Sequence, residues 1–340
     1  MEKASMIGLD IAKNVFEVHG RNAAGEVVLR RRLRRAQMEK FFAGHPRAVI
    51  GLEACGSAHY WGRLLERLGH EVRLMPPAYV KPYVKRNKND AHDAAACCEA
   101  MSRPGMRLVR VKTAEQQASL SLHRSRELLV RQRTQLGNAF RSLLAEFGVV
   151  AAKGREGLAL LATDLRAGVL DLPEAAGAAA LALADQRANL EAAIKDLERR
   201  IGEQAKAEPR ARLLQTAPGV GPISAHATLA TMPDPAMFKS GRDFAAWIGL
   251  TPRESSSGGK RRLGSITKQG DQTLRRLLVL GATAWLRQVR ANPEKGSLWL
   301  RGMLARRPFK VVATAQAART ARILWAMLTR NQPYRVPAAG

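Results

Sequence analysis

The sequence predicts an α/β domain followed by two mainly helical regions. Up to about residue 114, short runs rich in Val, Ile and Leu alternate with turns and one helix-like segment. Leucines then recur every seven residues, and the last third is basic and helix-like around a Pro-Gly-Val-Gly turn. The net charge also changes in three steps: +9 for residues 1–115, +2 for 116–206 and +16 for 207–340. We therefore expect three parts, residues 1–114, 115–206 and 207–335.

The first part has the pattern of a mixed sheet with helices. Three β-like runs, separated by Asn or Gly, occupy residues 5–12, 15–20 and 26–33. A buried-strand pattern follows at 47–53, then a helix-like segment at 58–69 and a further strand at 70–76. Three strands followed by strand, helix and strand is typical of a mixed α/β domain.

The middle part is predicted to form two long helices. Leucine repeats every seven residues in its first half, and a 7-4-3-4 spacing of Leu and Ile marks its second half: Leu122, Leu129, Leu136 and Leu143, then Leu183, Leu190, Ile194, Leu197 and Ile201. A Gly/Ala-rich stretch separates the two halves. This pattern favours an antiparallel coiled-coil hairpin. Two long helices of an ordinary bundle are the alternative.

The third part begins with a candidate helix–hairpin–helix at residues 213–232. The turn contains Gly219 and Gly221, which expose backbone N–H groups at the start of the second helix. Such N–H groups are able to bind a phosphate. A plain helical turn is the alternative.

Composition points to a polyanionic partner. Lys and Arg exceed Asp and Glu by 27, and the sequence pI is about 11.2. A ribosome-type or membrane-surface protein would share this charge, but we find no apolar run of about 20 residues. The N-terminal stretch MEKASMIGLDIAK has no signal-peptide core. The three cysteines form no CxxC pair, which argues against a structural zinc site and against a disulfide framework. We expect a cytoplasmic protein.

Four carboxylates form the candidate metal site. Asp10 and Glu53 each end a predicted strand, and Asp90 and Asp93 open a predicted helix, three residues apart on one face. Hard carboxylate oxygens are the ligands that Mg²⁺ prefers, and two such ions support phosphodiester chemistry. The basic flank of Lys85, Arg86 and Lys88 would hold a nucleic-acid backbone beside them. Taken singly, the alternatives are a helix cap, a first-turn acid and two turn residues.

A second candidate site is the loop at residues 249–270. It places Ser255, Ser256 and Ser257 before a pair of glycines that allow close approach of a phosphate. Cations that could hold the scissile phosphate flank the serines: Arg253, Lys260, Arg261, Arg262 and Lys268. The alternative is a solvated Ser/Gly loop that only grips backbone phosphates.

The combined motifs resemble one family over nearly the whole chain, from about Met6 to about Leu328. They are IGLDIAKNVFEV, GLEACGSAHYW, KNDAHDA, APGVGPISA and FAAWIGLTPRESSSGGKRRLGSITKQGDQTLRRLL. In order and rough spacing they resemble the DEDD transposases of bacterial insertion sequence family 110. The resemblance implies a RuvC-like domain of the RNase H fold, a coiled coil, and a C-terminal transposase domain with a nucleophilic serine.

The resemblance also assigns the residues and the partners. The four family acids fall on Asp10, Glu53, Asp90 and Asp93, with Mg²⁺ as the cofactor. The nucleophile falls on Ser257, and the triple serine leaves Ser256 as the alternative. In the family, the serine of one subunit and the acids of another form a composite centre, which implies a dimer or tetramer. Serine attack on DNA leaves a covalent phosphoserine link and a free 3′-hydroxyl.

A structured non-coding RNA guides members of the family to donor and target DNA. The protein would then be cytoplasmic and associated with the bacterial nucleoid. Candidate nucleic-acid contacts outside the serine loop include Arg31 and Arg32, in a run of five arginines among six residues. Two rival functions are a junction-resolving or RNase H-like nuclease that hydrolyses with water, and a non-catalytic nucleic-acid-binding protein.

Overall fold

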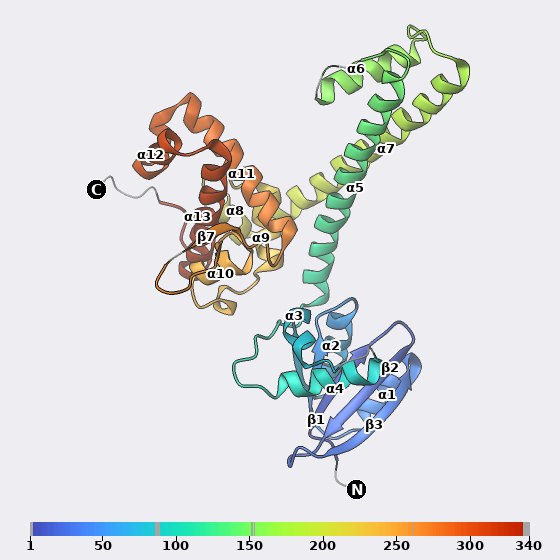
Figure 1. Cartoon of the computed structure of the whole chain (residues 1–340), viewed down its shortest axis with the longest axis vertical. Coiled ribbons are helices and arrows are strands. Elements are labelled where there is room, and N and C mark those ends of the chain that lie inside the picture. The colour runs from blue at the N-terminus through green and yellow to red at the C-terminus, as the bar shows by residue number, and fades with distance from the viewer. Residues whose placement is uncertain (1–2, 86–88, 151, 153, 261, 336–340) are drawn as a thin grey trace. The chain divides into compact units, whose positions relative to one another are not determined.

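A computed structural model describes residues 3–85, 89–150, 152, 154–260 and 262–335 of the chain. The chain divides into two compact units, Met1–Gln117 and Ala118–Gly340 (Figure 1). The first unit is α/β and the second is mainly helical, as the sequence predicts. Division of residues 115–206 from 207–335 into separate domains stays a prediction. Within the described residues, no helix has both the length and the apolar character required to cross a lipid bilayer.

The first unit contains a five-stranded sheet. Its strands are β1 (Met6–Ile11), β2 (Val15–Arg21), β3 (Val27–Arg34), β4 (Val49–Glu53) and β5 (Glu71–Met75). Their order across the sheet is β3-β2-β1-β4-β5. The pairs β1–β2 and β2–β3 are antiparallel, and the pairs β1–β4 and β4–β5 are parallel. The five strands predicted from the sequence are therefore confirmed.

Opposite faces of this sheet carry different side chains because successive residues of a strand alternate in direction. One face buries Ile7, Leu9, Ile50 and Leu52 against two helices, α1 (Met38–Ala43) and α2 (Ala58–Arg67). The other face is covered by α4 (Asp90–Met101), which packs on β1, β2 and β4. The short helix α3 (Pro77–Val80) lies between β5 and α4 in the chain.

Two glycines allow α4 to lie very close to the sheet. A Cβ atom on Gly8 of β1 would be 2.0 Å from the carbonyl oxygen of Ala94, and one on Gly51 would be 2.6 Å from the sulfur of Met101. Both Ala94 and Met101 belong to α4. Near the C-terminal end of the helix, two residues before Met101, Glu99 pairs with Arg21 of β2 at 2.7 Å. The glycines and this ion pair together fix where α4 crosses the strands.

The second unit begins with an antiparallel helix pair, α5 (Ala114–Ala145) and α7 (Glu174–Ala207), with α6 (Arg155–Arg166) between them in the chain. Two ion pairs show the antiparallel direction: Arg126–Glu198 at 2.5 Å and Arg133–Glu191 at 2.9 Å. The four predicted leucines of α5 are only half-buried. The buried stripe instead contains Leu120, His123, Gly137, Phe140 and Leu144.

The shift has a physical reason. A Cβ on Gly137 would lie 2.9 Å from Leu158 of α6, and His123 contacts His226, so α5 packs against more elements than α7 alone. On α7, the predicted Leu190, Ile194 and Ile201 are buried. The antiparallel arrangement is confirmed, and its supercoiling stays a prediction.

The rest of the second unit is a helical core with one small hairpin. Its elements are α8 (Pro209–Leu214), α9 (Pro222–Thr231), α10 (Gly241–Trp247), β6 (Pro252–Glu254), β7 (Leu263–Ile266), α11 (Gln272–Ala291), α12 (Leu298–Arg306) and α13 (Phe309–Arg330). Leu214, Phe244, Leu274 and Leu324 are among its fully buried side chains. Burial of such apolar groups is the main source of stability for this core.

Acid is expected to weaken the second unit through a buried histidine pair. The Nε2 of His123 on α5 lies 2.8 Å from the Nδ1 of His226 on α9. Burial, followed by the charges of His226 and Arg126, lowers the pKa of His123 from 6.5 to about 4. Burial also lowers the pKa of His226. Below pH 6.5 the unfolded chain takes up a proton at this histidine before the folded chain does. The free energy of unfolding therefore falls by about 3 kcal/mol as the pH is lowered from above 6.5 to 4.

Urea unfolding at pH 7 and pH 4 measures this loss when the parent chain is compared with His123→Gln. Glutamine can donate a hydrogen bond to His226 but does not gain a charge. We expect the variant to lose about 3 kcal/mol less between the two pH values. Equal losses would show that His123 titrates as it does in the unfolded chain.

Candidate active site

The close packing of α4 on the sheet brings three of the predicted acids together. Asp10 lies near the end of β1, on the same face as Gly8. Asp90 and Asp93 lie in the first turn of α4, which is capped by Asn89 through a 3.0 Å bond from the Ala91 amide. One carboxylate oxygen from each of the three acids lies within 4.8 Å of the others. Asp90 is thus part of the cluster, and the cap is its neighbour.

Electrostatics in this cluster favour a bound cation. Burial is the main cause that raises the pKa of Asp10 to about 6, and the negative charges of Asp93 and Asp90 add to it. Asp93 is half-buried and Asp90 is exposed. Hard carboxylate oxygens at this spacing fit an ion such as Mg²⁺, which would relieve their mutual repulsion. The three residues therefore fit the divalent metal site predicted from the sequence.

Glu53 lies on the strand next to Asp10. The parallel register pairs Gly8 with Gly51 and Leu9 with Leu52, so Glu53 continues this pairing opposite Asp10. Its charge makes the smallest of the contributions that raise the pKa of Asp10. Glu53 is not one of the three acids whose oxygens lie within 4.8 Å. The structure thus gathers three of the four predicted acids and places the fourth on the neighbouring strand.

The predicted serine loop forms the hairpin between β6 and β7. Ser257 and Lys260 form a β-bridge, and the Lys260 amide donates a 3.1 Å bond to the Ser257 carbonyl oxygen. Gly258 and Gly259 between them have φ values of 56° and 73°. Positive φ at both central positions is the geometry of a tight hairpin turn that glycine adopts without strain. Ser257 is therefore the last residue before the turn.

The hairpin distinguishes the two candidate serines. The Ser256 hydroxyl donates to the Glu254 carboxylate at 2.9 Å and accepts from the Arg262 amide at 3.2 Å. The Ser257 hydroxyl is exposed and has no hydrogen-bond partner among the described residues. Ser256 thus holds the hairpin together, whereas the hydroxyl of Ser257 is available to a ligand.

Arg275 supports the base of this loop, a role that sequence reasoning missed. Its Nη1 donates to the carbonyl oxygens of Ile248 and Gln269 at 2.7 and 2.6 Å. At the same place, a Cβ on Gly270 would lie 1.8 Å from the Trp247 carbonyl oxygen. In the sequence, Arg275 is visible only as one of two consecutive arginines at 275–276. That pattern does not predict hydrogen bonds to the carbonyl oxygens of the loop.

The predicted basic contacts are mostly solvent-exposed. Those described on the hairpin are Arg253, Lys260, Arg262 and Lys268, and all are exposed. Arg31 lies with its Cζ 5.4 Å from the Phe41 ring centre, and Arg32 pairs with Glu17. Lys85 is also exposed. Arg86, Lys88 and Arg261 lie outside the described residues.

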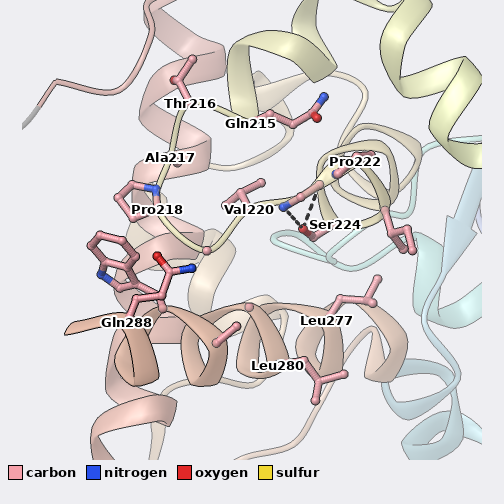
Figure 2. A pocket seen from close by; sticks show the side chains of 16 residues that line it. Gln215, Thr216, Ala217, Pro218, Val220, Pro222, Ser224, Leu277, Leu280 and Gln288 are labelled. Carbon is pink, nitrogen blue, oxygen red and sulfur yellow. Dashed lines mark hydrogen bonds between the residues drawn. The ribbon is translucent and has the colours of Figure 1, made fainter. Parts of the chain in front are cut away.

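The turn between α8 and α9 lines a groove of 710 Å³ together with α11 (Figure 2). A Cβ on Gly219 would lie 2.6 Å from the Gly281 carbonyl oxygen of α11, so these backbones touch. The Gly221 amide donates a 3.0 Å bond to the Ser224 hydroxyl, drawn dashed in Figure 2. A phosphate at Gly221 would have to displace that hydroxyl, and the phosphate role of this turn stays a prediction.

Comparison with known proteins assigns both units to one family. Residues 7–148 match a transposase family of the DEDD, IS110 type. Residues 211–297 match the family described as "Transposase IS116/IS110/IS902 family".

Three relatives match over almost the whole chain. The "Probable family 20 transposase" of Pseudomonas aeruginosa is 51% identical over 97% of this chain and 98% of the relative. The "Transposase for insertion sequence element IS1328" of Yersinia enterocolitica is 37% identical over 98% and 99%. The "Transposase for insertion sequence element IS1111A" of Coxiella burnetii is 39% identical over 99% and 93%. From these matches and the gathered acids, the chain belongs to the IS110 family of DEDD transposases.

Proposed function

We propose that the chain is an insertion-sequence transposase that cuts DNA strands and rejoins them. The observation that carries this proposal is the meeting of Asp10, Asp90 and Asp93 within the part of the chain that matches the DEDD family. The relatives from Yersinia and Coxiella are named as transposases of insertion sequence elements. The strand order β3-β2-β1-β4-β5, with two antiparallel pairs on one side of β1 and two parallel pairs on the other, supports the RuvC-like type of the RNase H fold.

The carboxylates would hold the divalent cofactor, with Mg²⁺ as the ion that their hard oxygens prefer. Asp10, Asp90 and Asp93, whose oxygens lie within 4.8 Å of one another, would be ligands, and Glu53 on the adjacent strand would complete the set. When bound, the ion would offset negative charge on the scissile phosphate and on the oxygen that leaves it. Asp10 must be deprotonated to act as a ligand, and a bound cation would lower its raised pKa.

Ser257 would supply the attacking oxygen. Its hydroxyl oxygen forms a bond to phosphorus while the bond from phosphorus to the 3′-oxygen breaks. The serine proton passes to solvent, and the departing 3′-oxygen takes up a proton. A 3′-hydroxyl can later attack the phosphoserine and release the serine, so rejoining requires no ATP. Exposed Arg253, Lys260 and Arg262 stand on the same hairpin, where they would contact the phosphate.

The proposed partners, besides DNA, are a structured guide RNA and at least one further copy of the chain. The net charge of +27 supports binding of more than one nucleic-acid strand. Exposed cations occur in both units, on Lys85 and on the serine hairpin. Sequencing of RNA that co-purifies with the chain tests the guide, and the mass of the DNA-bound complex distinguishes a dimer from a tetramer.

A trapping assay tests the reaction. The chain is mixed with Mg²⁺ and the DNA element that encodes it, and the products are separated under denaturing conditions. We expect a DNA strand joined covalently to protein, and its loss when Mg²⁺ is chelated. Asp10→Asn is expected to lower the yield at least about 100-fold because it removes a charged ligand.

The outcomes separate the rival functions. Mg²⁺-dependent cuts with no joined protein would indicate a junction-resolving nuclease that uses water. Full recombination in cells by Asp10→Asn and by Asp93→Asn would indicate that the acidic cluster is inert and the chain only binds nucleic acid. Either result would overturn the proposed transposase mechanism.

A further inference from the structure

Three charged side chains form a row across the sheet beside the acidic cluster. Asp10 of β1 pairs directly with Glu17 of β2, and Glu17 pairs directly with Arg32 of β3. Residues directly opposite one another on neighbouring strands point to the same face of the sheet. All three therefore lie on the face that α4 covers, with Asp10 in the metal cluster and Arg32 at the edge strand.

Glu17 forms an ion pair with Arg32 through a single nitrogen atom of the guanidinium. The Nε of Arg32 lies 2.5 Å from the Oε1 of Glu17. The Glu17 side chain is 14% exposed, whereas that of Arg32 is 70% exposed. Glu17 is not among the acids whose oxygens lie within 4.8 Å of one another. Its carboxylate thus anchors the arginine and does not join the metal cluster.

The remaining donors of Arg32 are available to a ligand. A guanidinium carries five N–H donors in a fixed plane, and the contact with Glu17 uses the Nε. The Nη1 and Nη2 groups have no partner among the described residues. The pKa of Arg32 is raised, mainly by its hydrogen bond to Glu17 and in smaller part by the charge of Asp90. The strand register places Arg32 two strands from Asp10, on the same face of the sheet.

We propose that Arg32 binds the phosphate of the nucleic-acid strand held at the acidic cluster, and that Glu17 positions it there. This inference rests on the proposed function. Three carboxylates repel a phosphodiester, and a bound divalent ion offsets only part of their charge. A guanidinium held by Glu17 in the same row as Asp10 offers its two Nη groups to the non-bridging phosphate oxygens, in a geometry that suits phosphate.

Neighbouring arginines of β3 do not share this position. Arg31 points to the opposite face, where its Cζ lies 5.4 Å from the Phe41 ring centre. Arg30 lies opposite His19 in the register of β2 and β3, and is therefore not in the row that contains Asp10. Of these three consecutive arginines, Arg32 alone stands in the row of Asp10.

Four variants of the full chain test the assignment: Arg32→Gln, Arg32→Lys, Glu17→Gln and the Glu17→Gln/Arg32→Gln double variant. Arg67→Gln is the matched control. It also removes one positive charge, but from an exposed position on α2, which packs on the face of the sheet opposite α4. Recombination of the encoding DNA element gives the rate, and titration with Mn²⁺ alone gives metal affinity. Anisotropy of a short labelled duplex in Ca²⁺ gives DNA affinity.

We expect Arg32→Gln to lower the rate about 100-fold, as the loss of one preorganised donor does elsewhere. Mn²⁺ affinity should be unchanged or tighter, because a cation near the site is removed. Arg32→Lys should recover part of the rate. Glu17→Gln should lower it about tenfold, and the double variant should be no slower than Arg32→Gln, since Glu17 acts through Arg32.

Three results would overturn the assignment: a rate for Arg32→Gln equal to that of Arg67→Gln, weaker Mn²⁺ binding as the main effect, or additive losses in the double variant. Normal thermal melting of each variant excludes misfolding as a cause. If Asp10→Asn abolishes recombination while Arg32→Gln matches the control, the acidic site stands and the inference about Arg32 alone is wrong.

Discussion

Ser257→Ala is expected to abolish the covalent protein–DNA product and to lower recombination by about 10⁴-fold or more, as removal of a nucleophile typically does. In the proposed reaction the Ser257 hydroxyl supplies the oxygen that bonds to phosphorus, and alanine has no substitute for it. Its backbone position before the Gly258–Gly259 turn remains available to alanine. DNA affinity, measured by anisotropy, should stay within about twofold of the parent because no cation is lost.

Ser256→Ala is the matched control one residue earlier. It removes the bonds to the Glu254 carboxylate and the Arg262 amide, which loosens the hairpin but leaves the Ser257 hydroxyl. We expect the covalent product to persist, with a rate lower by about tenfold or less, because two exposed hydrogen bonds of the hairpin are lost but the proposed attacking hydroxyl is kept. The opposite pattern, with the adduct lost in Ser256→Ala and kept in Ser257→Ala, would move the nucleophile to Ser256.

Gly8→Ala is expected to reduce the stability of the first unit and to disturb the proposed metal site. The added Cβ would lie 2.0 Å from the Ala94 carbonyl oxygen and 2.5 Å from the Cys98 amide nitrogen, both backbone atoms of α4. Because backbone cannot rotate away, α4 must move outward from the sheet. We expect a loss of about 3 kcal/mol in the free energy of unfolding, at the upper end for overpacking.

The same movement would carry Asp90 and Asp93 away from Asp10. Mn²⁺ affinity, measured by titration, should fall at least about tenfold, as it does when the support of metal ligands is disturbed. Gly177→Ala on α7 is the control, since nothing lies within 4 Å of its added Cβ and alanine favours a helix. Unchanged metal affinity in Gly8→Ala would show that α4 tolerates the extra atom.

Much of the first unit could be predicted because its pattern is local. Short apolar runs identify β1 and β4, and the acids at their ends follow from the chain itself. The meeting of Asp10 with Asp90 and Asp93 depends on how α4 crosses the sheet. That crossing is set by the space over Gly8 and Gly51, which no spacing rule reports.

Features that depend on distant partners could not be predicted from the sequence. The seven-residue leucine repeat did not give the buried stripe of α5, because α6 and α9 also pack on that helix. The different hydrogen bonding of Ser256 and Ser257 depends on how the hairpin folds, which the run of three serines does not reveal. The roles of Arg275 and of Glu17 likewise require knowledge of which carbonyl or guanidinium stands opposite each of them.

The ion pairs between α5 and α7 have a consequence for how this helical hairpin can change in length. Arg126 pairs with Glu198 and Arg133 with Glu191, so seven steps forward along one helix match seven steps back along the other. An insertion or deletion in one helix alone would slide every later contact out of alignment. Insertions or deletions of seven residues in both α5 and α7, made between these ion pairs and the connection through α6, would keep the two helices aligned. The helical hairpin can therefore change in length by whole seven-residue steps.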